Sequence, residues 1–95
     1  MTIKEIFRQA RCEAEKNVRN NELNTIVYMS GSKQKKNRME KMLKEYREDS
    51  KLDYELGVIS KDIHEFETKA AEILEKSLEN FIIFQEPEAA EGQQG

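Results

Sequence analysis

Apolar residues near the start of the chain recur every three or four positions, which is the spacing of one helix face. This stripe comprises Ile3, Ile6, Phe7, Ala10, Ala14 and Val18. Thr2 and Glu5 have the spacing of a capping box, in which each side chain binds the backbone amide of the other residue. Asparagine tolerates the left-handed conformation that ends helices, so we expect the helix to stop at Asn20 or Asn21. The pattern therefore predicts a capped N-terminal helix.

Two more helical patterns follow, and each is opened by a serine, a residue favoured at helix N-caps. The first begins at Ser32, or alternatively at Ser30. It ends near Leu56, where Gly57 suits a left-handed cap. Its apolar stripe is Met39, Met42, Leu43 and Tyr46. The second pattern begins at Ser60. Its stripe is Ile63, Phe66, Ala70, Ile73, Leu74, Ser77, Leu78 and Phe81. The very short link between the two patterns predicts an antiparallel helical hairpin.

Two short runs do not fit these helices. The stretch "TIVYM", within residues 22–29, is rich in β-branched and aromatic side chains. The only similar run is "FIIF" at residues 81–84, and a lone strand needs a partner. We favour helix or irregular packing for residues 22–29. A two-stranded ribbon that pairs them with residues 81–84 is the alternative.

Together these patterns predict an all-α fold, in which a capped N-terminal helix and a long antiparallel hairpin form a three-helix assembly. We expect a single helical domain over residues 1–84. The remainder, "QEPEAAEGQQG" at residues 85–95, is polar, acidic and rich in glycine and glutamine, so we expect a disordered acidic tail. A chain of 95 residues buries a smaller share of its surface than a larger chain does, so its core should be thin and a second copy would help to cover it.

The composition bounds the location of the protein. Charged residues make up 37% of the chain, well above the usual quarter. No stretch approaches the roughly eighteen apolar residues of a membrane span. The N-terminus lacks the apolar run of a signal peptide, and the single cysteine, Cys12, cannot form an internal disulfide. We therefore expect a cytoplasmic protein that does not bind a membrane.

Basic and acidic residues are divided unevenly along the chain. Residues 1–47 hold 12 Lys and Arg against 6 Glu, whereas residues 48–95 hold 4 Lys against 13 Asp and Glu. Such asymmetry can mark a nucleic-acid-binding face followed by an acidic tail. Two oppositely charged helices packed side by side would show the same division, and we favour this second interpretation.

The start of the second helix is strongly basic and supplies a candidate anion- or partner-binding set. The set is Lys33, Lys35, Lys36, Arg38, Lys41 and Lys44. Lysines in a first helical turn oppose the helix dipole, so we expect a negative partner nearby. An internal partner would come from Glu75, Glu79, Glu86, Glu88 and Glu91. An external partner would be an acidic protein surface or phosphate. Such lysines, without an arginine fork or an aromatic platform, predict only weak, sequence-independent nucleic-acid binding.

No catalytic, metal-binding or cofactor-binding signature stands out, so we expect a protein without enzymatic activity. His64, the single histidine, lacks the spacing of a zinc motif and is interpreted as a solvent-facing or turn-packing residue. Cys12 would need a base to act as a nucleophile, and neither Cys12 nor His64 lies on the apolar stripe of its helix.

A second apolar set falls off the predicted core and is a candidate interface. It comprises Leu52, Leu56, Ile82, Ile83 and Phe84. Exposed apolar patches of sufficient area usually mark interaction sites. The sequence therefore predicts a small, self-associating, non-enzymatic interaction protein of the adaptor or inhibitor type, of the size common among phage or bacterial accessory proteins. The alternative is a nucleic-acid-binding accessory factor that uses the basic start of the second helix.

Overall fold

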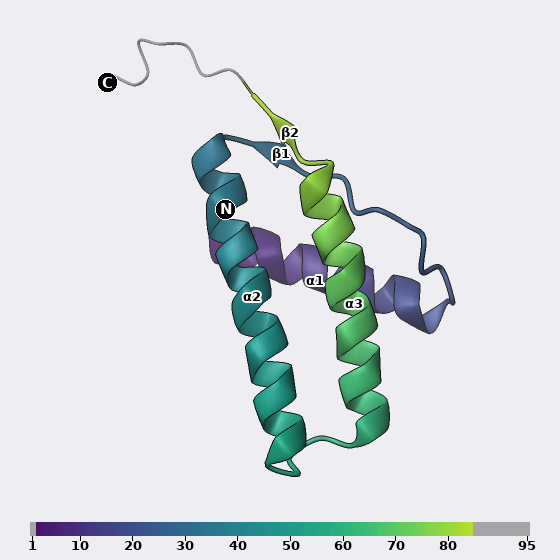
Figure 1. The fold of residues 1–95 in the computed structure, drawn as a ribbon. Helices are drawn as coiled ribbons and strands as arrows, with labels where there is room; N and C mark the ends of the chain where they lie inside the picture. The colour runs from purple at the N-terminus through teal and green to yellow at the C-terminus, as the bar shows by residue number, and fades with distance from the viewer. Residues whose placement is uncertain (1, 85–95) are drawn as a thin grey trace.

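The structure, a computed structural model, describes residues 2–84. Three helices account for most of this length: α1 (Ile3–Arg19), α2 (Lys33–Glu55) and α3 (Lys61–Glu79). Two short strands, β1 (Ser30–Gly31) and β2 (Ile82–Ile83), precede α2 and follow α3 respectively (Figure 1). The predicted all-α, three-helix fold is confirmed. The predicted acidic tail lies outside the described residues.

Local caps set the two ends of α1. Thr2 Oγ1 accepts a 3.1 Å hydrogen bond from the Glu5 amide, and the Thr2 amide donates a 2.7 Å hydrogen bond to the Glu5 carboxylate. This is the predicted capping box. The bond from the Thr2 amide lowers the pKa of Glu5, because it favours the ionised carboxylate. At the other end Asn21 has a φ of 61°, the left-handed conformation expected at this stop.

A glycine turn joins α2 to α3. Gly57 has a φ of 77°, which favours glycine. Its amide donates to the Tyr54 carbonyl at 3.1 Å, and the Val58 amide donates to the Asp53 carbonyl at 2.8 Å. These two bonds form the Schellman motif that satisfies the last carbonyls of a helix. Ser60 then caps α3 with its hydroxyl, as its position in the sequence predicted.

The core lies where α1 crosses one face of the antiparallel α2–α3 hairpin (Figure 1). Its buried apolar members are Phe7, Ala10, Ala14, Met39, Leu43, Ala70, Ala71, Ile73, Leu74, Leu78 and Phe81. Alanines on α1 and α3 are almost wholly buried, which lets the two helix backbones approach closely. Met39, Ile73 and Leu74 are the largest side chains among those that are fully buried. Most members of the three predicted stripes therefore share one core, whereas Ile63 and Phe66 of the α3 stripe lie outside it.

The turn end of the hairpin extends beyond α1. In Figure 1, α1 crosses near the end of the hairpin that carries the strands, and the turn lies at the opposite end. Ile63, which the sequence placed on the core stripe of α3, is 47% exposed. This prediction was wrong because Ile63 lies in the first turn of α3, where α1 no longer covers the hairpin.

Residues 22–29 run irregularly from α1 to β1, as favoured from the sequence. A two-stranded ribbon is nevertheless present, but its first strand is β1 rather than the "TIVYM" stretch. β1 and β2 are parallel, with Ser30 opposite Ile82 and Gly31 opposite Ile83. The Ile82 amide donates to the Met29 carbonyl at 3.0 Å. The ribbon therefore ties the start of α2 to the end of α3.

Candidate functional site

The predicted basic set lies along the first three turns of α2. Lys33, Arg38, Lys41 and Lys44 are exposed, whereas Lys35 and Lys36 are half-buried. Ser32 caps the helix immediately before them, with its hydroxyl accepting a 3.1 Å hydrogen bond from the Lys35 amide. The first turn contains no acidic residue, so the unfavourable placement of lysines against the helix dipole is real.

Lys35 serves the fold. Its ammonium donates a 2.8 Å hydrogen bond to the Ser30 carbonyl, on β1. Its aliphatic stem lies against Gly31, where an added Cβ would come within 2.5 Å of Lys35 Cδ. Glycine at position 31 thus makes room for the lysine. The Ser30 carbonyl was not among the partners predicted for this lysine.

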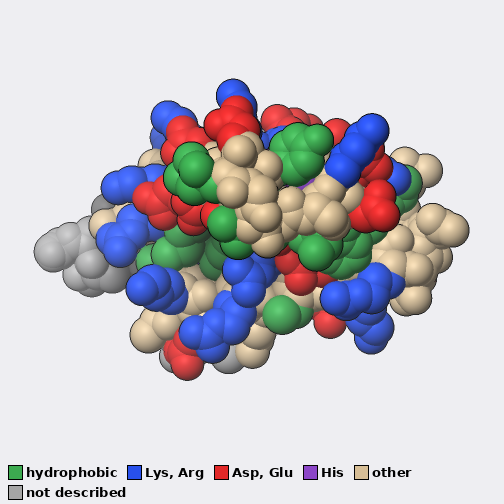
Figure 2. Space-filling model, turned by 90° about the horizontal axis from the view of Figure 1, so that it is seen from below, with side chains coloured by type: hydrophobic (Ala, Val, Ile, Leu, Met, Phe, Trp, Pro, Cys, Tyr) green, Lys and Arg blue, Asp and Glu red, His purple; other side chains and the backbone are tan. Residues whose placement is uncertain are grey.

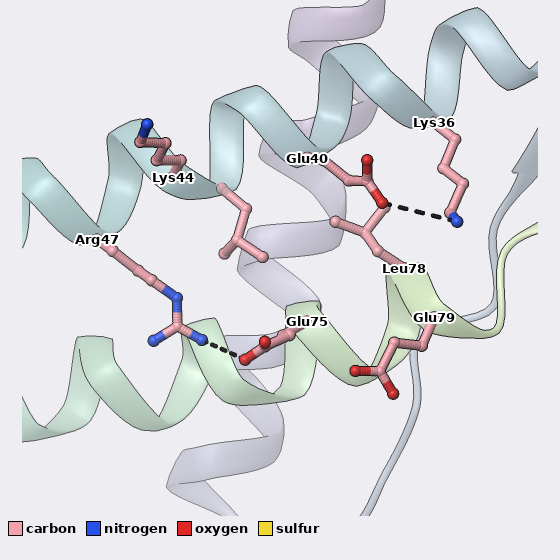
Figure 3. A pocket seen from close by; sticks show the side chains of 8 residues that line it. Lys36, Glu40, Lys44, Arg47, Glu75, Leu78 and Glu79 are labelled. Carbon is pink, nitrogen blue, oxygen red and sulfur yellow. Dashed lines mark hydrogen bonds and ion pairs between the residues drawn. The ribbon is translucent and has the colours of Figure 1, made fainter.

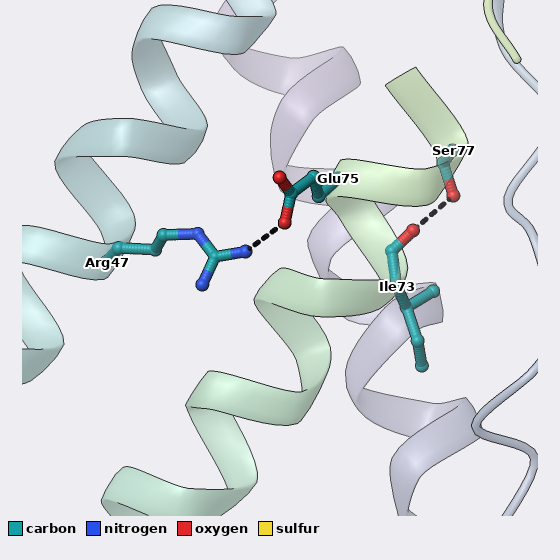
Figure 4. A network of polar contacts seen from close by, with 4 residues as sticks. All are labelled: Arg47, Ile73, Glu75 and Ser77. Carbon is teal, nitrogen blue, oxygen red and sulfur yellow. Dashed lines mark hydrogen bonds and ion pairs between the residues drawn. The ribbon is translucent and has the colours of Figure 1, made fainter. Parts of the chain in front are cut away.

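The acidic residues at the end of α3 meet the basic half of α2 in only one ion pair among the described residues. Arg47 donates to Glu75 at 2.7 Å (Figure 4). Lys36 instead pairs within α2, with Glu40 at 3.6 Å. Glu79 forms no ion pair with any of the described residues. Of the acidic residues predicted to face the lysines, Glu75 therefore pairs with Arg47 instead. Glu86, Glu88 and Glu91 lie outside the described residues.

A groove of about 360 Å³ separates the basic half of α2 from the end of α3 (Figure 3). It is lined by Lys36, Glu40, Leu43, Lys44, Arg47, Glu75, Leu78 and Glu79. The two leucines are buried and form its apolar part. Arg47 reaches across towards α3, whereas Lys44 turns its ammonium away from α3 (Figure 3). The groove offers mixed charges and no nucleophile with an adjacent base.

His64 packs close to the hairpin turn, in agreement with its turn-packing interpretation. Its ring stacks on Tyr54 with centroids 4.7 Å apart and an interplanar angle of 5°. Its Nδ1 lies 3.0 Å from the hydroxyl of Ser50, which is buried on α2. Cys12 is exposed on α1. Within residues 2–84, no group of three or more His, Cys, Asp and Glu side chains could hold a metal ion.

The predicted apolar interface is not one surface. Leu52 and Leu56 are 51% and 68% exposed near the turn, at the C-terminal end of α2. Ile82, Ile83 and Phe84 are 47–55% exposed beside β1, at the other end of the hairpin. With a rise of 1.5 Å per helical residue, about 30 Å of α2 separates the two sets. The structure therefore divides the predicted interface into two patches.

The first patch, which we call the tip patch, is larger than the sequence indicated. It consists of Leu52, Tyr54, Leu56, Val58 and Ile63, all more than 40% exposed. Figure 2 views the molecule from this end and shows apolar side chains between acidic and basic side chains. The prediction from the sequence lacked the two β-branched members: Val58 was not included, and Ile63 was placed on the core stripe of α3.

A second basic group, on α1, was also missed. Lys4, Arg8 and Arg11 line a groove of about 380 Å³ with Glu45, Tyr46 and Asp49 of α2 among its other members. Arg11 lies over the Tyr46 ring, 5.7 Å from its centroid. The Tyr46 hydroxyl donates a 2.7 Å hydrogen bond to Glu15. Burial, and then the Glu15 carboxylate, raise the pKa of Tyr46. The signal in the sequence was the helical spacing of the three basic residues beside the α1 stripe.

Comparison with known proteins adds no constraint: no family model, curated protein or solved structure matches this chain. Within residues 2–84, none of the helices combines the length and the apolar character that a bilayer crossing requires. The assignment of function therefore depends on the surface features described above.

Proposed function

We propose that this chain is a small, non-enzymatic protein-interaction protein of the adaptor or inhibitor type, which binds a partner protein through the tip patch and also associates with itself. The observation that carries the proposal is the exposure of four aliphatic side chains around one turn. They are Leu52, Leu56, Val58 and Ile63, with exposed fractions of 51%, 68%, 69% and 47%. A role as a phage or bacterial accessory protein fits this size and style.

Single exposed apolar residues are ordinary, but their clustering needs an explanation. The tip patch lies beyond the region that α1 covers, so the described fold leaves it in contact with solvent. Charged residues such as Lys51 and Glu55 adjoin it on α2. An apolar centre with a polar rim is the usual anatomy of a protein interface. The two grooves lined by basic residues of α1 and α2, in contrast, carry mixed charges.

A pull-down with the full chain tests the tip patch. Wild type should retain a discrete protein from a lysate of its source cells, and nuclease treatment should not release that protein. Leu52→Lys with Leu56→Lys should abolish its capture. Lys51→Gln with Glu55→Gln is the matched control, because it changes neighbouring side chains and keeps the apolar area. Equal capture by the lysine variant and wild type would contradict the proposal.

Nucleic-acid binding is the second candidate, and one observation favours it. Among the described residues, Lys33, Lys41 and Lys44 make no ion pair, and their spacing places them on the outer side of α2. Phosphate contacts of this kind would give weak binding that falls steeply with salt. Fluorescence anisotropy with a mixed-sequence oligonucleotide tests it. Binding at low salt that is lost when the three lysines become glutamine would support this candidate over the first.

A further inference from the structure

We propose that two copies of this chain associate by pairing the open edges of their β2 strands, antiparallel and across a twofold axis, with Ile83 facing Ile83 of the second copy. This inference rests on the proposed self-association and names the surface that produces it. It does not involve the tip patch, which lies at the other end of the hairpin.

The hydrogen bonds of the ribbon show that β2 has one free edge. The amides of Ile82 and Phe84 donate to carbonyls of residues 29 and 31, so both amides point towards β1. Backbone groups of successive strand residues point to opposite sides. The amide and carbonyl of Ile83 therefore point away from β1. Within residues 2–84, no hydrogen bond satisfies them.

The opposite edge of the ribbon is partly covered. The Ser30 carbonyl points away from β2, and it accepts the 2.8 Å hydrogen bond from Lys35. A lysine at a strand edge is a common device against further strand addition. With Lys35 across β1, the β2 edge is the more open one, so pairing should stop at a closed dimer with the strand order β1–β2–β2–β1. An isologous contact of this kind uses the same patch on both copies.

The side chains of this segment suit antiparallel self-pairing. With Ile83 on the axis, Ile83 opposes its copy on one face of the ribbon, and Ile82 opposes Phe84 of the second copy on the other face. All three side chains are about half exposed in the single chain. Pairs of β-branched and aromatic residues stabilise neighbouring strands, and like charges directly opposite destabilise them. Residues 80–85, "NFIIFQ", carry no charge, so self-pairing brings no like charges together.

A two-residue ribbon also gains from extension. Isolated two-stranded sheets are marginally stable in water, whereas three or more strands with an apolar face are much more stable. A second copy doubles the ribbon to four strands and covers the half-exposed isoleucines. An extended peptide from another protein could use the same edge, and in that case the free chain would remain monomeric.

Ile83→Pro is the direct test, because it removes the one amide that the proposed pairing needs. Proline is tolerated on an edge strand when the missing amide faces solvent, so the ribbon with β1 should survive. Ile83→Thr is the matched control, since it keeps the amide and the β-branched shape. Sedimentation equilibrium of the full-length chain up to several hundred micromolar should show a dimer for wild type and the threonine variant. Loss of two backbone hydrogen bonds should weaken the proline variant by about tenfold or more.

A second variant keeps the test sharp if the proline variant fails to fold, which circular dichroism would reveal. Facing residues in antiparallel strands have Cα atoms about 5.5 Å apart, within the range of a disulfide. In a Cys12→Ser background, Ile83→Cys should form a covalent dimer under mild oxidation, whereas Leu56→Cys in the tip patch should not. A wild-type chain that stays monomeric would overturn both the self-association and this inference. A wild-type dimer that Ile83→Pro leaves intact, or that Ile83→Cys fails to cross-link, would overturn the pairing of β2 alone.

Discussion

The backbone amide of Val27 donates a 2.9 Å hydrogen bond to the hydroxyl of Ser77, fifty residues further along the chain. The same hydroxyl donates a 2.7 Å hydrogen bond to the carbonyl of Ile73, one turn earlier in α3. Ser77 is 1% exposed, so both partners are needed to satisfy it. This explains a serine on the apolar stripe of α3. The hydrogen bond from the Val27 amide also fixes the irregular segment between α1 and β1 against the core.

Ser77→Ala should destabilise the fold through Val27. The change costs little in packing volume, but it leaves the half-buried Val27 amide without an acceptor, and such a group costs about 1–3 kcal/mol. Urea unfolding followed by circular dichroism measures the loss. Ser50→Ala is the control, because the buried Ser50 hydroxyl contacts the His64 ring rather than a backbone group. An alanine at position 77 that costs no more than one at position 50 would contradict this account.

The helices could be predicted because residues close together in the sequence determine where each helix begins and ends. Thr2 and Glu5 form a capping box three positions apart, and Gly57 ends α2 through bonds that span six residues. Such local chemistry does not depend on the rest of the fold. The apolar spacing then indicated which helix faces meet. It failed at Ile63, where the position of α1 rather than local spacing decides what is buried.

The ribbon and the candidate site depend on contacts between distant residues. β1 consists of a serine and a glycine, which have no strand preference, and it pairs with residues about fifty positions later. Lys35 was predicted to bind an anion or a partner. Its hydrogen bond to the Ser30 carbonyl could not be foreseen, because that bond depends on the turn at Gly31. Leu56 and Ile83 were predicted to share one interface because both are apolar. In the fold they lie at opposite ends of the hairpin, separated by the length of α2. Spacing in the sequence carries none of this information.

Tyr46→Phe should change how stability depends on pH. Burial and the Glu15 carboxylate raise the pKa of Tyr46 above its ordinary value of 10.0, so the folded chain holds a proton that the unfolded chain loses. The stabilisation is therefore complete below pH 10 and declines as the pH rises towards the folded-state pKa. Wild-type stability should fall more steeply than that of the variant above pH 10.

The same variant also removes the 2.7 Å hydrogen bond to Glu15. At neutral pH the cost should be about 1.5 kcal/mol, the lower end for a bond to a charged group, because Glu15 is partly exposed. Urea unfolding of both proteins from neutral pH to above pH 10 measures both effects. Tyr28 and Tyr54 are exposed and present in both chains, so the difference isolates Tyr46. Parallel pH profiles would show that Tyr46 titrates normally.

Gly57→Ala should destabilise the hairpin turn through its backbone alone. A Cβ at this position would meet no atom within 4 Å, so there is no steric clash with neighbours. The φ of 77° remains unfavourable for alanine and should cost about 1–2 kcal/mol. Gly57→Asn should cost less, because asparagine tolerates this conformation. Thermal and urea unfolding of the two variants would rank them, and an alanine variant as stable as wild type would contradict the turn geometry.

Lys35→Met should convert a closed assembly into an open one. Methionine keeps the length and apolar stem of the side chain but cannot donate to the Ser30 carbonyl, so the outer edge of β1 loses its cover. If β2 edges pair as proposed, the variant has two free edges per chain and should form species larger than a dimer as concentration rises. Lys33→Met is the matched control, because it removes the same charge from an exposed neighbour. Sedimentation velocity and light scattering distinguish the two. Identical size distributions for both variants would show that Lys35 does not limit strand addition.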